Sequence, residues 1–359
     1  MQDGAILTVD GTVNATGHGD HGKGWVEGSL RMGDGTAVIA GTGTINLKSK
    51  GSLLNIGSDK ALRRLTLDGV TLVGLPDNDQ TLVNVHNGGE LVLKSGAVTG
   101  NTRVGDERIS GGGVGVWEGG SFIMEGGEIS GNSVSSVKVG TGGGVNVDKG
   151  TFAMSGGKIA DNNASGKEQG KGGGVRVTGG STFTMTGGTI SGNNALGGSV
   201  GNDSGGVLID GSAFIMSGGV ITGNTATGGN ARAGGVRVTS PGSIFTMTGG
   251  TIAGNSADRS AGGVEAGYGG VFIMEGGTIY GKADSLPAGT DASLANSAPQ
   301  GASLIVQNYK NDPLSTAKWG IGGTYTKGGV PQTGGGDIVR NDYEGTKGTD
   351  DTLIAAPRQ

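Results

Sequence analysis

The pair Phe-x-Met returns along the middle of the chain at an almost constant interval, and no other feature restricts the fold as strongly. Successive copies are 30, 31, 31, 31 and 27 residues apart, and weaker copies with Leu91 and Leu65 in the Phe place extend the pattern upstream. A period of about 31 residues is typical of stacked units in a repeat architecture. The phenylalanines of the six clear copies are Phe122, Phe152, Phe183, Phe214, Phe245 and Phe272.

Within each unit the apolar residues alternate with polar ones, as in short strands with one buried face. Val175 and Val177 flank one residue, Phe183 and Met185 flank another, and an isoleucine further on marks a third strand. Gly-Gly pairs and a Ser-Gly-Asn turn separate the strands, because glycine supplies the positive φ that sharp corners need. The pattern predicts an all-β fold, a right-handed parallel β-helix of about 8–9 coils with three short strands per coil.

Composition is consistent with a solenoid and argues against a conventional helical enzyme domain. Glycine makes up 83 of the 359 residues, while aromatic residues are only 4% and charged residues 16%. Such a chain has enough large side chains for a core only if they recur in columns. The net charge of −5, without a basic cluster, makes nucleic acid an unexpected partner. We expect no transmembrane segment, because no run of 18 apolar residues occurs, and we find no export signal in the sequence.

An open last rung of a solenoid would pair with further strands, so both ends are expected to carry caps. We predict an N-terminal β cap over residues 1–60, repeats over 61–282 and a C-terminal capping segment over 283–359. Lys282 takes the place of the turn asparagine in the last clear repeat, so the column of asparagines is expected to end there. This column is predicted to be a structural ladder of stacked amides, and its members are Asn101, Asn132, Asn162, Asn193, Asn224 and Asn255.

A stretch of variable length separates each turn asparagine from the next Gly-Gly-Gly-Val. These stretches fall at one phase of the repeat, so they are predicted to be loops along one edge of the solenoid. Variable loops on a fixed scaffold often carry binding, although solvated connectors without a partner remain an equal alternative.

Charged residues on the outward positions provide the candidate binding site. Asp148 and Asp210 stand two rungs apart in the alignment, roughly 9.6 Å, with Arg176 between them, and Arg237 stacks on Glu265. Carboxylates at such a separation could flank a sugar, which makes a polysaccharide lyase or glycoside hydrolase acting on acidic glycans the alternative to a binding protein. We nevertheless expect no catalytic residues and no enzyme activity, because no column places two carboxylates on neighbouring rungs.

An outward strip between the Phe and Met positions includes Thr184 and Thr246. Threonine ranks of this kind would suit an ice-binding solenoid, but only two of the six positions carry threonine, so a packing surface for a loop or partner is favoured. His18, Asp20 and His21 lie in a glycine-rich stretch that could hold a divalent metal only weakly. We therefore predict neither a metal site nor a cofactor.

The unit GGGVRVTGGSTFTMTGGTISGN resembles the Gly-rich right-handed parallel β-helix repeat proteins of bacterial cell surfaces. The resemblance spans roughly residues 80–282. This region is similar in architecture to autotransporter passenger domains and to polymorphic outer-membrane proteins, although the FxxN element of the latter is absent. It implies an extracellular or surface-associated, non-enzymatic scaffold in adhesion, ligand binding or envelope structure. The implied partners are a glycan, a host or matrix protein, or a neighbouring surface protein.

Overall fold

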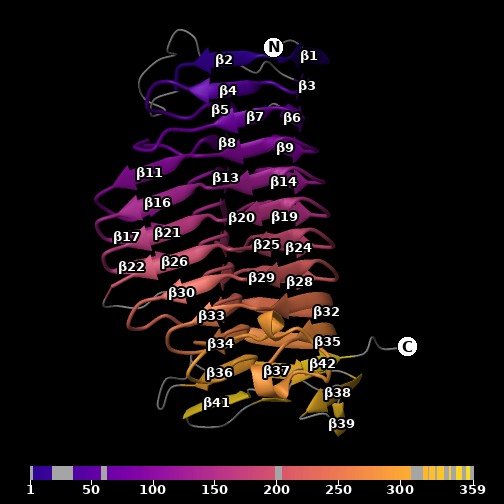
Figure 1. Ribbon diagram of the computed structural model, residues 1–359. Coiled ribbons are helices and arrows are strands. Elements are labelled where there is room, and N and C mark those ends of the chain that lie inside the picture. Colours follow the sequence, from indigo (N-terminus) through magenta and orange to yellow (C-terminus); the bar gives the residue numbers. More distant parts are fainter. Residues whose placement is uncertain are drawn as a thin grey trace.

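The computed structural model stacks the chain into a single solenoid of parallel strands (Figure 1). It describes residues 3–17, 35–57, 63–198 and 204–308, together with strands between 318 and 355. The regular part comprises about 8 turns spaced about 31 residues apart, which confirms the predicted all-β parallel solenoid. Within these residues the helical elements are two short 3-10 turns, η1 (Ala283–Ser285) and η2 (Ala292–Leu294).

Three faces surround the core, and a typical coil of the described part contributes one short strand to each face. The valine face consists of β5 (Leu54–Ile56), β8 (Val83–Val85), β13 (Val114–Trp117), β18 (Val145–Asp148), β23 (Val175–Thr178), β27 (Val207–Asp210), β31 (Val236–Thr239), β34 (Val264–Gly267) and β36 (Leu304–Asn308). The phenylalanine face consists of β1 (Ala5–Thr8), β3 (Gly35–Ala40), β6 (Arg63–Asp68), β9 (Gly89–Leu93), β14 (Ser121–Met124), β19 (Thr151–Met154), β24 (Thr182–Met185), β28 (Ala213–Met216), β32 (Ile244–Ala253), β35 (Val271–Ile279) and β37 (Lys318–Ile321). The isoleucine face consists of β2 (Thr12–Ala15), β4 (Thr44–Leu47), β7 (Thr71–Val73), β10 (Ala97–Thr99), β15 (Glu128–Ser130), β20 (Lys158–Ala160), β25 (Thr189–Ser191) and β29 (Val220–Thr222), and it continues in the second halves of β32 and β35.

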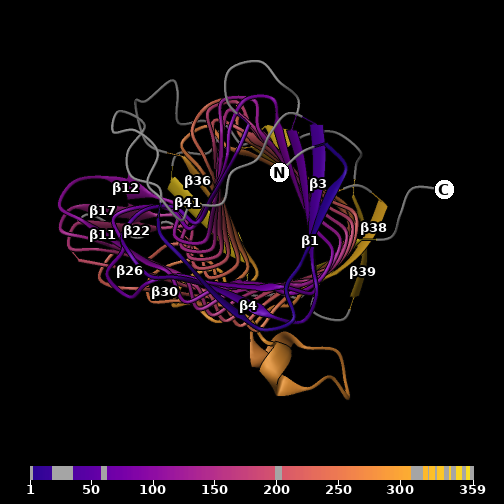
Figure 2. The same cartoon turned by 90° about the horizontal axis from the view of Figure 1, so that it is seen from above.

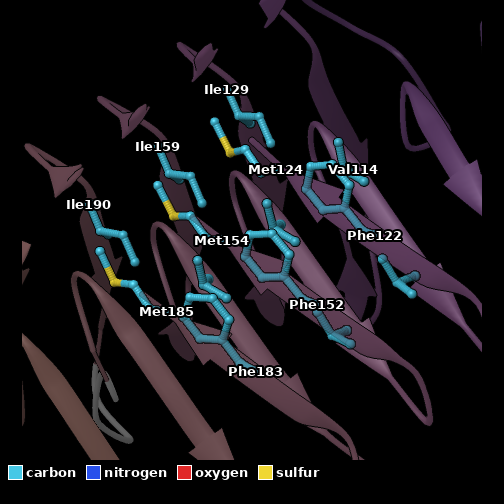
Figure 3. Packing of buried hydrophobic residues seen from close by; sticks show 14 of the residues in the cluster. Val114, Phe122, Met124, Ile129, Phe152, Met154, Ile159, Phe183, Met185 and Ile190 are labelled. Carbon is cyan, nitrogen blue, oxygen red and sulfur yellow. The ribbon is translucent and has the colours of Figure 1, made fainter. Parts of the chain in front are cut away.

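Identical side chains lie above one another inside the prism, as the period predicts. Phe152 and Phe183 are register partners, and their ring centroids are 4.6 Å apart with planes inclined by only 4°. Figure 3 shows the Phe, Met and Ile columns side by side. The stack tilts only at its last step, where the Phe245 and Phe272 rings are 5.1 Å apart and inclined by 31°. The spacing equals the strand separation in a sheet, so the hydrogen bonds and the ring stack are satisfied together.

The predicted asparagine ladder is confirmed, and it runs further than expected. Asn193 Oδ1 accepts hydrogen bonds from the backbone N–H and the Nδ2 of Asn162, at 3.0 and 2.9 Å, and the same pair of bonds repeats from rung to rung. The column does not end at Lys282, because Asn296 accepts the corresponding bonds from Asn255 at 2.9 and 3.1 Å. The insertion that carries η1 and η2 lengthens this coil to 41 residues. Asn296 therefore does not fall at the 31-residue spacing, and the repeat pattern does not show that it belongs to the column.

Parallel strands reach into both segments that are predicted to cap the solenoid. Within residues 1–60, β1 pairs in parallel with β3 and β2 with β4, and these strands continue the same faces as the repeats. Beyond residue 282 the coil continues as well, because β36 and β37 pair in parallel with β34 and β35. Antiparallel strands then pair with these last parallel strands, and they are β40 (Val339–Arg340), β41 (Gly345–Thr349) and β42 (Leu353–Ala355). A hairpin of β38 (Gly323–Lys327) and β39 (Val330–Gly334) pairs in turn with β42.

The stretches expected to be variable loops are largely stacked strands. They project from one side of the prism as a second, thinner structure, here called the fin (Figure 2). Its first sheet consists of β11 (Thr102–Gly105), β16 (Ser133–Ser136), β21 (Asn163–Gly166), β26 (Asn194–Gly197), β30 (Thr225–Thr227) and β33 (Ser256–Ala257), and its second of β12 (Ile109–Ser110), β17 (Val139–Thr141) and β22 (Gln169–Lys171). The two sheets approach closely through small residues: a Cβ added to Gly170 would lie 2.2 Å from the Ala164 carbonyl oxygen.

Candidate functional site: the polar seam beside the fin

Side chains on the outer positions of the valine face are polar and yet buried. Asn146, Arg176 and Arg237 alternate with inward valines, so they point away from the core, but they are 0%, 6% and 3% exposed. In the coils of Asn146 and Arg176 the chain that returns from the second sheet of the fin lies against them, since a Cβ on Gly142 would be 2.8 Å from Asn146 Cβ and one on Gly172 would be 3.1 Å from Arg176 Cβ. We call the region between this returning chain and the valine face the seam, and define its charged members as Arg108, Asp148, Lys171, Arg176, Asp210, Arg232, Arg237 and Glu265.

Glycines before the valine strands create this arrangement, and three of these strands, β13, β18 and β23, follow a glycine triplet. Gly172 has a φ of +65°, which turns the chain from β22 back toward the prism. A Cβ on Gly173 would lie 2.3 Å from the Asn194 carbonyl oxygen, and one on Gly174 would lie 3.0 Å from the amide of Asn193. Larger residues would therefore push the returning chain off the fin and off the ladder, so the triplet keeps the seam narrow.

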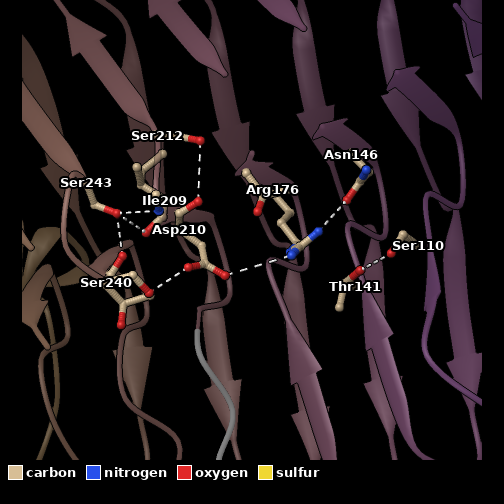
Figure 4. Close-up of polar contacts among 12 residues, drawn as sticks. Ser110, Thr141, Asn146, Arg176, Ile209, Asp210, Ser212, Ser240 and Ser243 are labelled. Carbon is tan, nitrogen blue, oxygen red and sulfur yellow. Dashed lines mark hydrogen bonds and ion pairs between the residues drawn. The ribbon is translucent and has the colours of Figure 1, made fainter. Parts of the chain in front are cut away.

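Arg176 lies at the middle of the seam and connects neighbouring rungs. Its Nη1 donates to Asn146 Oδ1 at 3.2 Å, and its Nη2 lies 3.9 Å from Asp210 Oδ2 (Figure 4). Asp210 also accepts a hydrogen bond from Ser240 Oγ at 2.7 Å. Burial lowers the pKa of the Arg176 guanidinium, although the nearby Asp210 carboxylate opposes this effect. This series of contacts, from Asn146 through Arg176 and Asp210 to Ser240, thus holds the side chains of successive rungs in fixed positions.

Lys171 reaches the same region from the second sheet of the fin. Burial, together with the positive charges of Arg237 and Arg108, lowers its pKa to about 8, while Asp210 acts in the opposite direction. A lysine with this pKa carries its proton only part of the time near pH 8, chiefly because its ammonium group is withdrawn from water. Loops were expected here, and Lys171 and Arg108 were not among the predicted site residues.

A second charged cluster lies toward the C-terminal end of the seam. Glu265 is fully buried, with Arg237 Nε 3.3 Å and Arg232 Nη1 3.6 Å from its Oε1, and it accepts from Ser260 Oγ at 2.8 Å. Tyr268 accepts a hydrogen bond from Arg232 at 3.1 Å and lies beneath both guanidinium groups. The predicted stacking of Arg237 on Glu265 is confirmed, since the two are register partners. The buried carboxylate of Glu265 is thus paired with two guanidinium groups, so it does not lie in the interior as an isolated charge.

The structure brings some of the predicted binding residues together and separates others. Asp148 and Asp210 are both partners of Thr178 in the register, so they stand two rungs apart on the valine face as expected, and Arg176 leans toward Asp210. Thr184 and Thr246 lie on the phenylalanine face instead, on either side of Ile215 in one outward column. They belong to a different surface from the seam, and the two groups cannot form one site.

The described residues contain no group of three or more His, Asp or Glu side chains arranged to hold a metal ion. His18, Asp20 and His21, the weak metal candidates, lie outside the described residues. None of the helical turns in the described part of the chain is long and apolar enough to cross a membrane. No family model matches the chain, and neither a curated protein nor a solved structure matches it.

Proposed function

We propose that the chain is a non-enzymatic binding scaffold, exposed at a cell surface or secreted, and that it presents the half-buried outer edge of the valine face, beside the seam, to an extended ligand. The observation that carries the proposal is the row of polar side chains that Arg176 fixes across neighbouring rungs. Binding proteins gain affinity when such groups are held in place before the ligand arrives, because less conformational entropy is lost. The resemblance to Gly-rich surface repeat proteins supports the location and the roles in adhesion or envelope structure.

The seam also has the dimensions of an extended site. From Trp117 to Gly267 the outer edge of the valine face spans five rung steps, or about 24 Å at the usual strand spacing. Trp117, Asp148, Thr178 and Asp210 are all half-buried along this edge. A polymer that follows the solenoid axis would therefore meet several fixed polar groups in succession.

A polysaccharide lyase or glycoside hydrolase remains the second candidate, and one observation favours it. A lysine whose pKa is near 8 can act as a general base, and Lys171 has this property beside Arg176. Asp210 is a less suitable acid or base, because it is engaged by Ser240 and lies near Arg176.

One experiment separates the two functions. The full chain is applied to an array of glycans and matrix proteins, and the ligands it retains are then incubated with it and analysed for chain cleavage. We expect retention without cleavage. Cleavage that disappears in the double variant Asp148→Ala, Asp210→Ala would overturn the non-enzymatic proposal, and an absence of retention on the whole array would refute the binding scaffold.

A further inference from the structure

We infer that Trp117 and Asp148 bind a neutral glycan on the outer edge of the valine face. In this arrangement the aromatic ring of Trp117 stacks on the apolar face of a sugar ring, and the Asp148 carboxylate accepts hydrogen bonds from sugar hydroxyls. The two residues are register partners at the ends of β13 and β18, so their backbones are about 4.8 Å apart. The inference rests on the proposed binding function and names the chemistry of its ligand.

The indole of Trp117 is held in one orientation. Its Nε1 donates to Asn84 Oδ1 at 2.9 Å, and Asn84 is itself fixed, because its Nδ2 donates to Ser52 Oγ at 2.8 Å and to Asn55 Oδ1 at 3.1 Å. The indole lies against Gly115, where an added Cβ would be only 2.6 Å from Nε1 and 2.7 Å from Cζ2. A ring that is fixed before the ligand arrives loses little conformational entropy on binding.

The accessible part of the Trp117 side chain is apolar. Its only polar atom, Nε1, is already bonded to Asn84, so the surface that this half-buried residue keeps on its side chain is carbon. The corner residues that follow it, Glu118 and Gly119, are exposed, so a ligand reaches this edge directly from solvent without entering a cleft. The faces of an aromatic ring are apolar and slightly negative, which suits the C–H groups on the face of a sugar ring.

The Asp148 carboxylate supplies hydrogen-bond acceptors next to this ring. No group in the described part of the chain donates a hydrogen bond to it or forms an ion pair with it, although its charge favours the protonated form of Arg176. Its Oδ1 lies beside Gly179, where an added Cβ would be only 2.3 Å away, and Gly179 and Lys149 are both exposed. An ionised carboxylate only accepts hydrogen bonds, so its ligand has to bring donors, and sugar hydroxyls are donors of this kind.

The directions of the two side chains favour an oligosaccharide over a single sugar. The Trp117 indole reaches toward β8, and the Asp148 carboxylate reaches toward the corner after β23. Together they cover three rung steps, or about 14 Å at the usual strand spacing. A glycan that follows the solenoid axis can place one ring on Trp117 and the hydroxyls of another beside Asp148. A uronate polymer would bring further carboxylates toward Asp148, so a neutral glycan fits this edge better.

The test measures binding of the full chain to cellohexaose and xylohexaose by titration calorimetry, with glucose and polygalacturonate for comparison. The equatorial hydroxyls of these hexaoses leave flat apolar faces on their rings. Trp117→Leu removes the aromatic ring, and Asp148→Asn removes the charge with little change of shape. We expect each variant to weaken hexaose binding about tenfold or more, and we expect glucose and polygalacturonate to bind much more weakly than the hexaoses.

Two control variants make the same changes away from this edge. Asp161→Asn is matched to Asp148→Asn, because Asp161 is exposed on the corner after β20 and its Oδ1 would be 2.3 Å from a Cβ on Gly192, as Asp148 Oδ1 is from one on Gly179. Tyr280→Leu is matched to Trp117→Leu, because Tyr280 is half-buried at the end of β35. Both controls should leave hexaose binding unchanged.

The outcomes distinguish this inference from the proposed function. Hexaose binding that Trp117→Leu or Asp148→Asn leaves unchanged, or equally tight binding of polygalacturonate, would overturn it. If Trp117→Leu does not fold, Asp148→Asn still decides. Retention of other ligands on the array without binding of either hexaose would refute the glycan site and leave the binding scaffold in place. Retention of a matrix protein that both variants abolish, again without hexaose binding, would assign this edge to a protein partner and overturn the inference alone.

Discussion

Replacing Asn193 by alanine tests whether the buried ladder joins the coils energetically. The side chain is fully buried and takes part in four hydrogen bonds. It accepts from the backbone N–H and the Nδ2 of Asn162, and it donates to the Ile159 carbonyl oxygen and to Asn224 Oδ1, each at 2.9–3.0 Å. Alanine can make none of these bonds.

The expected loss follows from the groups left without partners. The Asn162 N–H loses its acceptor, and the Ile159 carbonyl and the Asn224 amide each lose a donor. At about 1–3 kcal/mol for each buried group whose bond is lost, with partial relaxation, the variant should be destabilised by about 3–5 kcal/mol. Because each coil contacts only its neighbours, the damage should be local, and it should weaken the coupling between the coils on either side.

The assay is urea unfolding combined with hydrogen exchange resolved by peptide. The control is Asn194→Ala, one residue further along, because this side chain is half-buried and lies on the fin, and we expect it to cost at most about 0.5 kcal/mol. Faster exchange in N193A should be concentrated in β20, β25 and β29. If N193A lowered the free energy of unfolding as little as N194A, the hydrogen bonds of the ladder would not stabilise the stack of coils, and the reasoning would be refuted.

Two further predictions concern the fin and the seam. Gly170→Ala should destabilise the fin by about 1–3 kcal/mol, because the new methyl group would meet the Ala164 carbonyl oxygen. The control Gly229→Ala should be neutral, because a Cβ at this position has open space around it. Equal hydrogen-exchange rates of β22 in the two variants would contradict this prediction. Lys171→Met should stabilise the protein at pH 7, because the native pKa of about 8 lies below the ordinary 10.5 and the protonated amine is penalised in the fold. The gain, on the order of 2–3 kcal/mol, should shrink as the pH rises from 8 to 10.5, since native Lys171 then loses its proton before the unfolded chain does; a difference that does not change with pH would refute the assignment.

The core was predictable because its side chains repeat. Phe152, Phe183 and Phe214 each face the same neighbours in every coil, so a column of identical residues in the sequence becomes a column in space. The turn asparagines obey the same rule, and their spacing predicts the ladder. Where an insertion changes the spacing, as between Asn255 and Asn296, the rule no longer works although the hydrogen bonds remain the same.

The fin escaped prediction because most of its buried positions carry small residues. The buried position of its first sheet carries Val134, Ala164, Ala195 and Ala226 in successive coils, and the second sheet approaches through glycine. Small residues of this kind are typical of loops, and only the close approach of two backbones requires them here. Lys171 therefore lay in a segment interpreted as a connector, and its proximity to Arg176 required the fold of the fin.

A parallel solenoid restricts the positions at which like charges can stand in one column. Like charges in one column would lie about 4.8 Å apart and repel each other. The chain avoids this by placing opposite charges in register, as with Arg64 and Glu90 on neighbouring rungs, whose side chains are 3.0 Å apart. The charged groups around Lys171 come from two different structures, the fin and the valine face. Their relative positions are therefore set by how the fin joins the prism, and pairing within a single column does not determine them.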